Sequence, residues 1–136
     1  MAAQRTIPRP LLAAVALIIF ASAYVYFLTP TQEYADITVA DAKALIEEKP
    51  DMVILDVRTP SEFDDGRLEG AINIPVDYLA ERFDELSKDD ELLAYCRTGN
   101  RSARAVGILN DNDFTKIFHM DEGITGWLDA GYPVVE

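Results

Sequence analysis

The stretch LLAYCRTGNRSARAVGILN, residues 92–110, joins an apolar run to a helical pattern through one short polar loop. The apolar run, which the sequence places at residues 91–96, is short and continuous. Such a run is typical of a strand buried on both faces of a parallel sheet. Residues 102–110 have small and apolar side chains at helical spacing. A strand that leads through a loop into a helix is the repeating unit of α/β folds. The stretch therefore predicts an α/β domain.

Strand and helix signals alternate on both sides of this unit. Apolar runs at residues 52–57 and 114–120 predict two further strands. Helical patterns occupy residues 39–48 and 76–87, and a short last helix is expected at residues 126–130. Because strand–helix–strand connections are right-handed, these alternating elements predict one mostly parallel sheet with helices on both faces.

The only cysteine of the chain, Cys96, stands at the carboxyl end of the predicted strand, where sites gather in parallel sheets. Gly99 and Asn100 readily adopt left-handed backbone angles, so the loop can point several N–H groups at one centre. Such N–H groups and nearby guanidinium groups favour a thiolate. Three arginines lie within eight residues of the cysteine: Arg97, Arg101 and Arg104. The pattern predicts a reactive sulfur; a buried cysteine that serves as a small hydrophobe is the alternative.

The N-terminal part differs from the rest in composition. Residues 1–10 are short and basic, residues 11–28 carry no charge, and residues 29–36 indicate a linker before a domain at residues 37–136. At ~1.5 Å rise per residue, the uncharged run would form a helix about 27 Å long, which matches the hydrocarbon thickness of a bilayer. It predicts a single-pass membrane anchor. A secretory signal cleaved near Ala23 also fits, whereas a core helix would need covering on every side.

Charge sets the expected orientation and excludes one class of partner. Arg5 and Arg9 precede the uncharged run, so the positive-inside rule places the domain on the extracytoplasmic side. After cleavage, the domain would instead be secreted or periplasmic. Beyond Leu28 the chain has 24 acidic and 10 basic residues, a formal net charge of −14. Such acidity argues against nucleic-acid binding.

Three segments resemble motifs of the rhodanese family. CRTGNRS, residues 96–102, is similar to the active-site loop written C-x-x-G-x-R-S. ILDVRTPSEFDDGRLEGAINIP, residues 54–75, is similar to the family's D-V-R strand end, E-F helix and G-A-x-N-I-P segment. EGITGWLDAGYPV, residues 122–134, resembles the family's ending. The resemblance covers residues 36–135 and implies a rhodanese-like parallel sheet flanked by helices.

The resemblance also implies sulfurtransferase chemistry without a metal or an organic cofactor. In this chemistry the thiolate of Cys96 would attack the sulfane sulfur of thiosulfate or of a persulfide donor and become a persulfide. A thiol, or cyanide in an assay, would then accept the outer sulfur, and a partner protein is a further candidate acceptor. Because the chain has one cysteine and one histidine, a metal site of ordinary ligand type is not expected.

The family motif assigns roles to the residues of the loop. Backbone N–H groups would cradle the persulfide, and they belong to Arg97, Thr98, Gly99, Asn100, Arg101 and Ser102. Arg101 would close the loop and help to hold the donor anion, and Arg97 would tune donor preference. Upstream, Asp56 and Arg58 match the D-x-R at a strand end and are expected to brace the loop as an ion pair.

Four residues outside the loop have separate expectations. His119 is expected to be a surface or strand residue that does not pair with Cys96, and Trp127 to be part of the core. Arg67 stands where many family members have histidine, which would change the surface near the site rather than the chemistry. Glu122 replaces the first of two glycines, which leaves the start of the last helix open.

Two other functions use the same scaffold. Related dual-specificity phosphatases have five residues between the cysteine and the arginine of the loop, because phosphate needs a wider cradle than sulfur. Here Cys96 and Arg101 are separated by four residues, which disfavours a phosphatase or arsenate reductase. The second alternative is a non-catalytic binding or docking module, but such modules usually lose the cysteine. The sequence therefore favours a sulfurtransferase or sulfur carrier.

Overall fold

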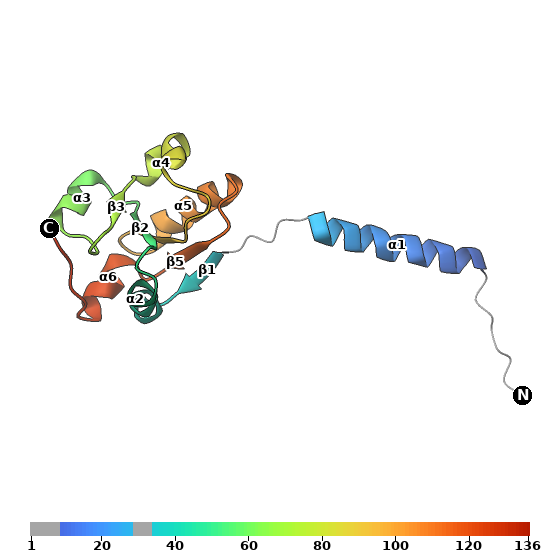
Figure 1. Ribbon diagram of the computed structural model, residues 1–136, viewed down its shortest axis with the longest axis horizontal. Helices are drawn as coiled ribbons and strands as arrows, with labels where there is room; N and C mark the ends of the chain where they lie inside the picture. Colours follow the sequence, from blue (N-terminus) through green and yellow to red (C-terminus); the bar gives the residue numbers. More distant parts are fainter. Residues whose placement is uncertain (1–8, 29–33) are drawn as a thin grey trace, which may run out of the picture. The chain divides into compact units, whose positions relative to one another are not determined.

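The computed structural model describes the chain except for residues 1–8 and 29–33. Most of the predicted basic N-terminus and the first part of the predicted linker therefore lie outside the described residues. The chain divides into two compact units, residues 1–31 and 32–136, which are described separately here (Figure 1).

In the first unit, the residues that the structure describes form the helix α1 (Arg9–Leu28). Of the helices in the described part of the chain, none combines the length and the apolar character that crossing a bilayer requires. The membrane anchor that the sequence predicts over residues 11–28 is thus not confirmed, and it stays a prediction.

The second unit is built on a five-stranded sheet in which every pair of neighbouring strands is parallel. The strand order is β1-β5-β4-β2-β3, which places β4 at the centre (Figure 1). This confirms the predicted α/β fold with a parallel sheet. The strands are β1 (Tyr34–Ile37), β2 (Val53–Asp56), β3 (Ile72–Asn73), β4 (Leu92–Tyr95) and β5 (Ile117–Met120).

Helices cover both faces of the sheet, as the resemblance implied. They are α2 (Val39–Glu48), α3 (Pro60–Asp65), α4 (Val76–Arg82), which continues as a 3₁₀ turn (Phe83–Glu85), α5 (Asn100–Asp111) and α6 (Gly123–Asp129).

Two apolar clusters hold the helices on the sheet. Because side chains alternate along a strand, Leu92 and Ala94 of β4 face one cluster, and Leu93 and Tyr95 face the other. The first cluster takes in α4 and α5, and the second takes in α2 and α6, which Figure 1 shows on opposite sides of the sheet. Trp127 lies in the second cluster and is buried.

Several element boundaries differ from those expected. β1 includes residues 34–36, which the sequence assigns to the linker. The helix expected at residues 76–87 changes to a 3₁₀ turn at Phe83, and α5 begins two residues earlier than residue 102. Both changes lie at helix ends, where capping and fraying decide the boundary.

Candidate active site

The site lies in the loop between β4 and α5. Cys96 directly follows β4, and Gly99 has a left-handed backbone (φ 96°) where α5 begins. A Cβ atom on Gly99 would lie 2.0 Å from the carbonyl oxygen of Asp121. Only glycine therefore allows both this turn and the close approach of the loop that follows β5.

Hydrogen-bond donors contact the sulfur of Cys96 from residues 96–102, the sulfur-binding loop, which includes the first residues of α5. The N–H of Gly99 donates to Sγ at 3.1 Å, and the hydroxyl of Ser102 lies 3.4 Å from Sγ. Burial alone would raise the pKa of the Cys96 thiol, because only 1% of the residue is exposed. The hydrogen bonds from the Ser102 side chain and from loop N–H groups outweigh burial and hold the pKa below its usual value. The loop therefore favours a thiolate.

The carbonyl oxygens at the start of the loop are occupied by a second segment. The N–H of Ile124 donates to the carbonyl oxygen of Cys96 at 2.8 Å, and the N–H of Thr125 donates to that of Arg97 at 3.1 Å. Gly123 (φ 63°) permits this contact, because a Cβ there would lie 2.3 Å from the Arg97 oxygen. The start of α6 thus braces the sulfur-binding loop.

The loop arginines have different surroundings. Arg101 forms a bidentate ion pair with Glu62 of α3, with both N–O distances at 2.7 Å. Arg104 lies 2.5 Å from a carboxylate oxygen of Asp77. Among the described residues, Arg97 is the loop arginine that forms no ion pair. The resemblance implied that Arg101 helps to hold the donor, but here its guanidinium is engaged by Glu62.

Glu62 is held in place at the start of α3. Thr59 and Glu62 form a capping box, in which each side chain accepts a hydrogen bond from the backbone N–H of the other residue. The ion pair with Arg101 and the bonds from Thr59 outweigh partial burial and lower the pKa of Glu62 from 4.5 to about 2. Arg101 thereby fastens the sulfur-binding loop to α3.

Asp56 and Arg58 form a buried ion pair at the end of β2, with Nη2 and Oδ2 separated by 2.6 Å. The hydroxyl of Tyr95 donates to the same Asp56 oxygen at 2.7 Å, and Arg58 also donates to the carbonyl oxygen of Gly66 at 2.6 Å. A buried ion pair is stable when further hydrogen bonds satisfy its polar atoms, as they do here. The network ties the ends of β2 and β4 to the segment before β3.

Residues 38–130 match the model of the Rhodanese-like domain family. The chain belongs to this family. A protein named "Sulfurtransferase" from Allochromatium vinosum is 30% identical over 90 residues, which cover 66% of this chain and 84% of that protein. A crystal structure of a rhodanese-related protein from Thermoplasma volcanium is 38% identical with a TM-score of 0.67, covering 75% of this chain and 98% of the other.

Some relatives are much longer than this rhodanese-like domain. The tRNA uridine(34) hydroxylase of Escherichia coli is 30% identical over 105 residues, but the match spans only 30% of its length. The family domain therefore occurs both as nearly the whole of a protein and as one part of a larger one.

The two departures from the rhodanese motif have structural roles. Arg67 pairs with Val135 through two backbone hydrogen bonds, and its guanidinium lies over the ring of Phe63. It thus fastens the C-terminal segment. Glu122 has right-handed helical angles, which need no glycine, and its carboxylate accepts a hydrogen bond from the N–H of Val39 at 3.2 Å. The open question about this helix start is thereby answered.

His119 has no direct contact with Cys96, as expected, but it contacts a residue that does. The residue is on strand β5 as expected, but it is 5% exposed, and its Nε2 atom lies 2.8 Å from the hydroxyl of Ser102. That hydroxyl also contacts Cys96, so the histidine reaches the sulfur through one side chain. The parallel pairing of β4 with β5 explains this contact, because it puts His119 opposite Ala94, two residues before the cysteine.

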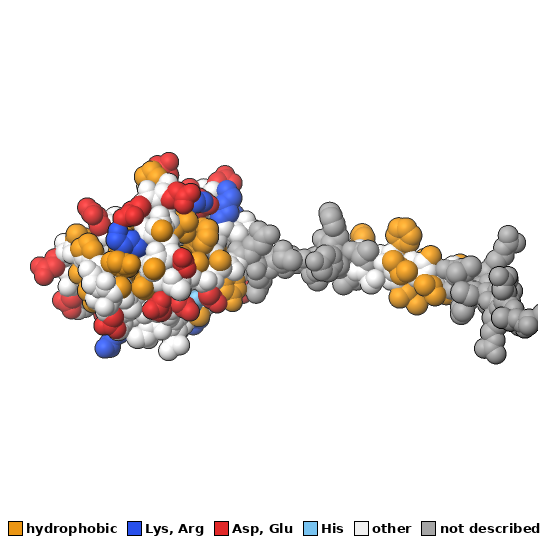
Figure 2. Space-filling model, turned by 90° about the horizontal axis from the view of Figure 1, so that it is seen from below, with side chains coloured by type: hydrophobic (Ala, Val, Ile, Leu, Met, Phe, Trp, Pro, Cys, Tyr) orange, Lys and Arg blue, Asp and Glu red, His pale blue; other side chains and the backbone are white. Residues whose placement is uncertain are grey.

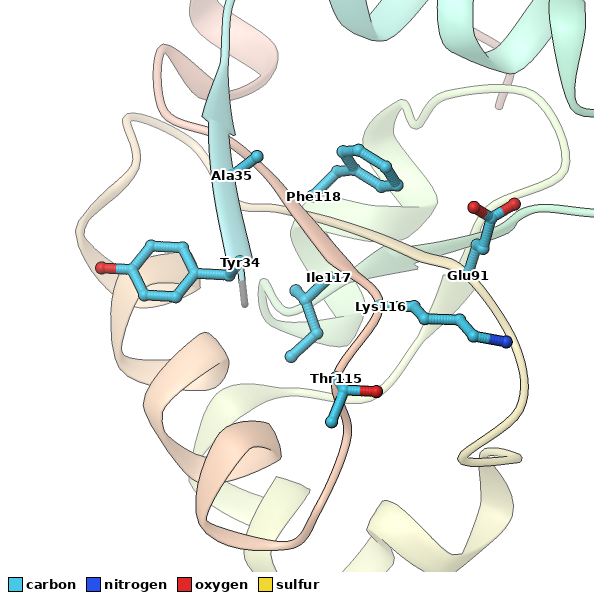
Figure 3. A pocket seen from close by; sticks show the side chains of 7 residues that line it. All are labelled: Tyr34, Ala35, Glu91, Thr115, Lys116, Ile117 and Phe118. Carbon is cyan, nitrogen blue, oxygen red and sulfur yellow. The ribbon is translucent and has the colours of Figure 1, made fainter. Parts of the chain in front are cut away.

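Two pockets lie at different ends of the sheet. One, of about 410 Å³, adjoins the sulfur-binding loop and is lined by Arg58, Glu62, Asp65, Arg97, Ile124, Thr125, Leu128 and Asp129. The other, shown in Figure 3, lies near the amino ends of β1 and β5, and its lining includes Tyr34, Glu91 and Lys116 but not the cysteine. The first pocket thus lies beside the loop, and Cys96 is not among the residues that line it either. Within the described part of the chain, no group of three potential metal ligands occurs.

Proposed function

We propose that the chain is a sulfurtransferase that moves a sulfane sulfur from thiosulfate or a persulfide donor to a thiol or to cyanide through a persulfide on Cys96. The observation that carries this proposal is the set of donors around the sulfur. The Gly99 N–H donates to Sγ and the Ser102 hydroxyl lies within hydrogen-bond distance of it, and both contacts favour a lower pKa of the thiol. The same donors suit the negative charge of a bound persulfide.

The reaction has two displacement steps. The thiolate of Cys96 forms a bond to the sulfane sulfur while the sulfur–sulfur bond of thiosulfate breaks, and sulfite leaves with the bonding electron pair. An acceptor thiolate, or the carbon of cyanide, then attacks the outer sulfur. The sulfur of Cys96 leaves with the second electron pair and is again a thiolate. Proximity in the donor cradle, rather than a cofactor, supplies the catalysis.

Arg97 is the candidate donor-binding cation. It lines the pocket beside the loop, whereas Arg101 and Arg104 are engaged by carboxylates. The pocket also holds Glu62, Asp65 and Asp129, which disfavour a highly charged anion. This charge pattern supports a modest affinity for thiosulfate, a dianion.

The direct test is thiocyanate release from thiosulfate and cyanide by the purified full chain, with Cys96→Ser as the matched variant. Turnover by the natural chain that is absent from the variant supports the proposal. A folded chain that shows no turnover, and that acquires no additional sulfur mass on incubation with thiosulfate, contradicts it.

One observation favours the docking-module alternative. Only 1% of Cys96 is exposed, so a donor has restricted access to the sulfur. In a docking module the loop would bind a partner's group without transfer, and Cys96→Ser would leave that binding intact. Inactivity of the natural chain in the thiocyanate assay would favour this alternative.

The location is proposed from the sequence alone. Residues 11–28 would anchor the chain in a membrane with the domain on the extracytoplasmic side, or would be removed by cleavage near Ala23. Mass measurement of the chain from the membrane fraction and from the soluble extracytoplasmic fraction distinguishes the two. An intact chain that alkaline washing releases from the membrane would contradict both.

A further inference from the structure

The hydroxyl of Ser102 has one proton and three acceptors within reach. Its oxygen lies 3.4 Å from Sγ of Cys96, 3.0 Å from the carbonyl oxygen of Gly99, and 2.8 Å from Nε2 of His119. The proton can be directed at only one of these acceptors at a time. Its direction therefore decides whether the sulfur receives the side-chain hydrogen bond that helps to lower its pKa.

The imidazole of His119 is held by a carboxylate on the neighbouring strand. Asp36 of β1 is the register partner of His119 in β5, and its Oδ1 lies 2.7 Å from Nδ1 of the ring. The side chain of His119 is buried, whereas that of Asp36 is more than half exposed. A carboxylate oxygen can only accept, so it receives the hydrogen bond from Nδ1 and orients the ring with Nε2 toward Ser102.

The protonation state of the ring sets the direction of the serine hydrogen bond. In a neutral ring with its proton on Nδ1, toward Asp36, the bare Nε2 accepts the Ser102 proton, and the sulfur loses that donor. When Nε2 also has a proton, it donates to the Ser102 oxygen or to the Gly99 carbonyl oxygen, which lies 3.2 Å away. The Ser102 proton is then free to donate to the sulfur.

We propose that His119, oriented by Asp36, is a positioning residue that directs the Ser102 hydroxyl toward the sulfur of Cys96. In this arrangement an N–H at Nε2 donates to the Gly99 carbonyl oxygen or to the Ser102 oxygen, and the Ser102 proton is left for the sulfur. The charged groups that face the chain of contacts are Asp36 from β1 and the thiolate after β4. On α5, the guanidinium of Arg101 is engaged by Glu62.

The test measures thiolate formation and does not need turnover. Thiolate absorbs ultraviolet light near 240 nm (a general property of thiols), and the chain has one cysteine, so subtraction of the Cys96→Ser spectrum isolates its titration. Replacing His119 by Phe keeps a ring and removes both nitrogens. We expect the midpoint of thiolate formation in the purified full chain to rise by about 0.5 to 1 pH unit.

Two further variants distinguish positioning from a structural role. Ser102→Ala should raise the midpoint, and adding His119→Phe to it should cause no further rise, because the histidine acts through the hydroxyl. Gln at position 119 retains an amide donor and should return the midpoint toward that of the natural chain. Circular dichroism shows whether each variant is folded.

A matched pair of charge changes tests the carboxylate. Asp36→Asn should raise the midpoint in the same direction, whereas Asp51→Asn, an exposed position without a contact to this chain of residues, should not. The inference rests on the proposed function, but different results would contradict the two proposals. It fails if folded His119→Phe keeps the natural midpoint or lowers it, or if its shift adds to that of Ser102→Ala. Absence of thiocyanate release from the natural chain would count against the proposed function instead.

Discussion

At the scale of the residue, Gly99 meets two demands at once: a left-handed backbone and a close approach to Asp121. Replacement by Ala should lower the free energy of unfolding by about 2 kcal/mol or more, because it adds both backbone strain and a clash with backbone. Urea unfolding measures this change. Gly107→Ala is the control, within the helix that Gly99 precedes: a Cβ there meets no atom within 4 Å, and the change should stabilise α5 by about 0.5 to 1 kcal/mol. Equal effects would contradict the explanation.

Arg97 and Arg104 offer a second comparison between single residues. Arg97→Gln should raise KM for thiosulfate by about three- to tenfold, the effect of losing a partly exposed ionic contact worth roughly 1 kcal/mol. Arg104→Gln removes the same charge from a residue already paired with Asp77 and should change KM much less. Steady-state thiocyanate assays measure both. Similar increases would mean that general charge, rather than a contact from Arg97, attracts the donor.

At the scale of the element, the ion pair between Glu62 and Arg101 joins α3 to α5, and it should make stability depend on pH. Because folding lowers the pKa of Glu62 to about 2, its contribution is present above the ordinary value of 4.5 and is lost as the pH falls toward 2. Glu62→Gln should therefore destabilise the chain at pH 7 by about 1 kcal/mol, after allowance for partial exposure. The difference from the natural chain should shrink in urea unfolding below pH 4.5.

A matched carboxylate checks that this effect comes from the link between elements. Glu85 is also paired with an arginine, Arg82, but both lie within one exposed segment. Glu85→Gln should change stability little at either pH. A Glu62→Gln difference that stayed constant between pH 7 and pH 3 would contradict the proposed coupling.

The elements also show what could be predicted from sequence. The buried strands β2, β4 and β5 have continuous apolar runs, so their pattern was visible. β1 reads YADI with a mostly exposed pattern, and β3 has only two residues, so neither has a strand signal of its own. They exist because neighbouring strands supply hydrogen-bond partners, which is a tertiary effect.

The same limit applies to the site. Cys96 and its loop are contiguous in sequence, so a local pattern could indicate them. The contacts of Glu62 and His119 with this loop join residues 39 and 17 positions apart. Strand order and register bring them together, and these cannot be inferred from a local motif.

At the scale of the whole molecule, charge dominates the surface. Figure 2 shows acidic side chains spread over the visible face of the domain, with few basic ones between them. The formal charge of −14 beyond Leu28 repels thiosulfate at long range, and salt screens this repulsion beyond a Debye length of ~8–10 Å. KM for thiosulfate should therefore fall as sodium chloride rises from about 20 to about 150 mM. KM for a neutral thiol acceptor should stay constant, and a steep loss of activity with salt would contradict the prediction.

The contact between the sulfur-binding loop and the start of α6 has a consequence for the newly made protein. The N–H groups of Ile124 and Thr125 come from a segment that follows β5, the last strand of the sheet along the chain. A chain that ends before this segment lacks these two hydrogen bonds to the loop. We therefore expect the loop to take its final shape around the sulfur only after the C-terminal part has been synthesised and has joined the sheet. Until then, the nascent polypeptide has a cysteine without the hydrogen-bond donors that favour its thiolate.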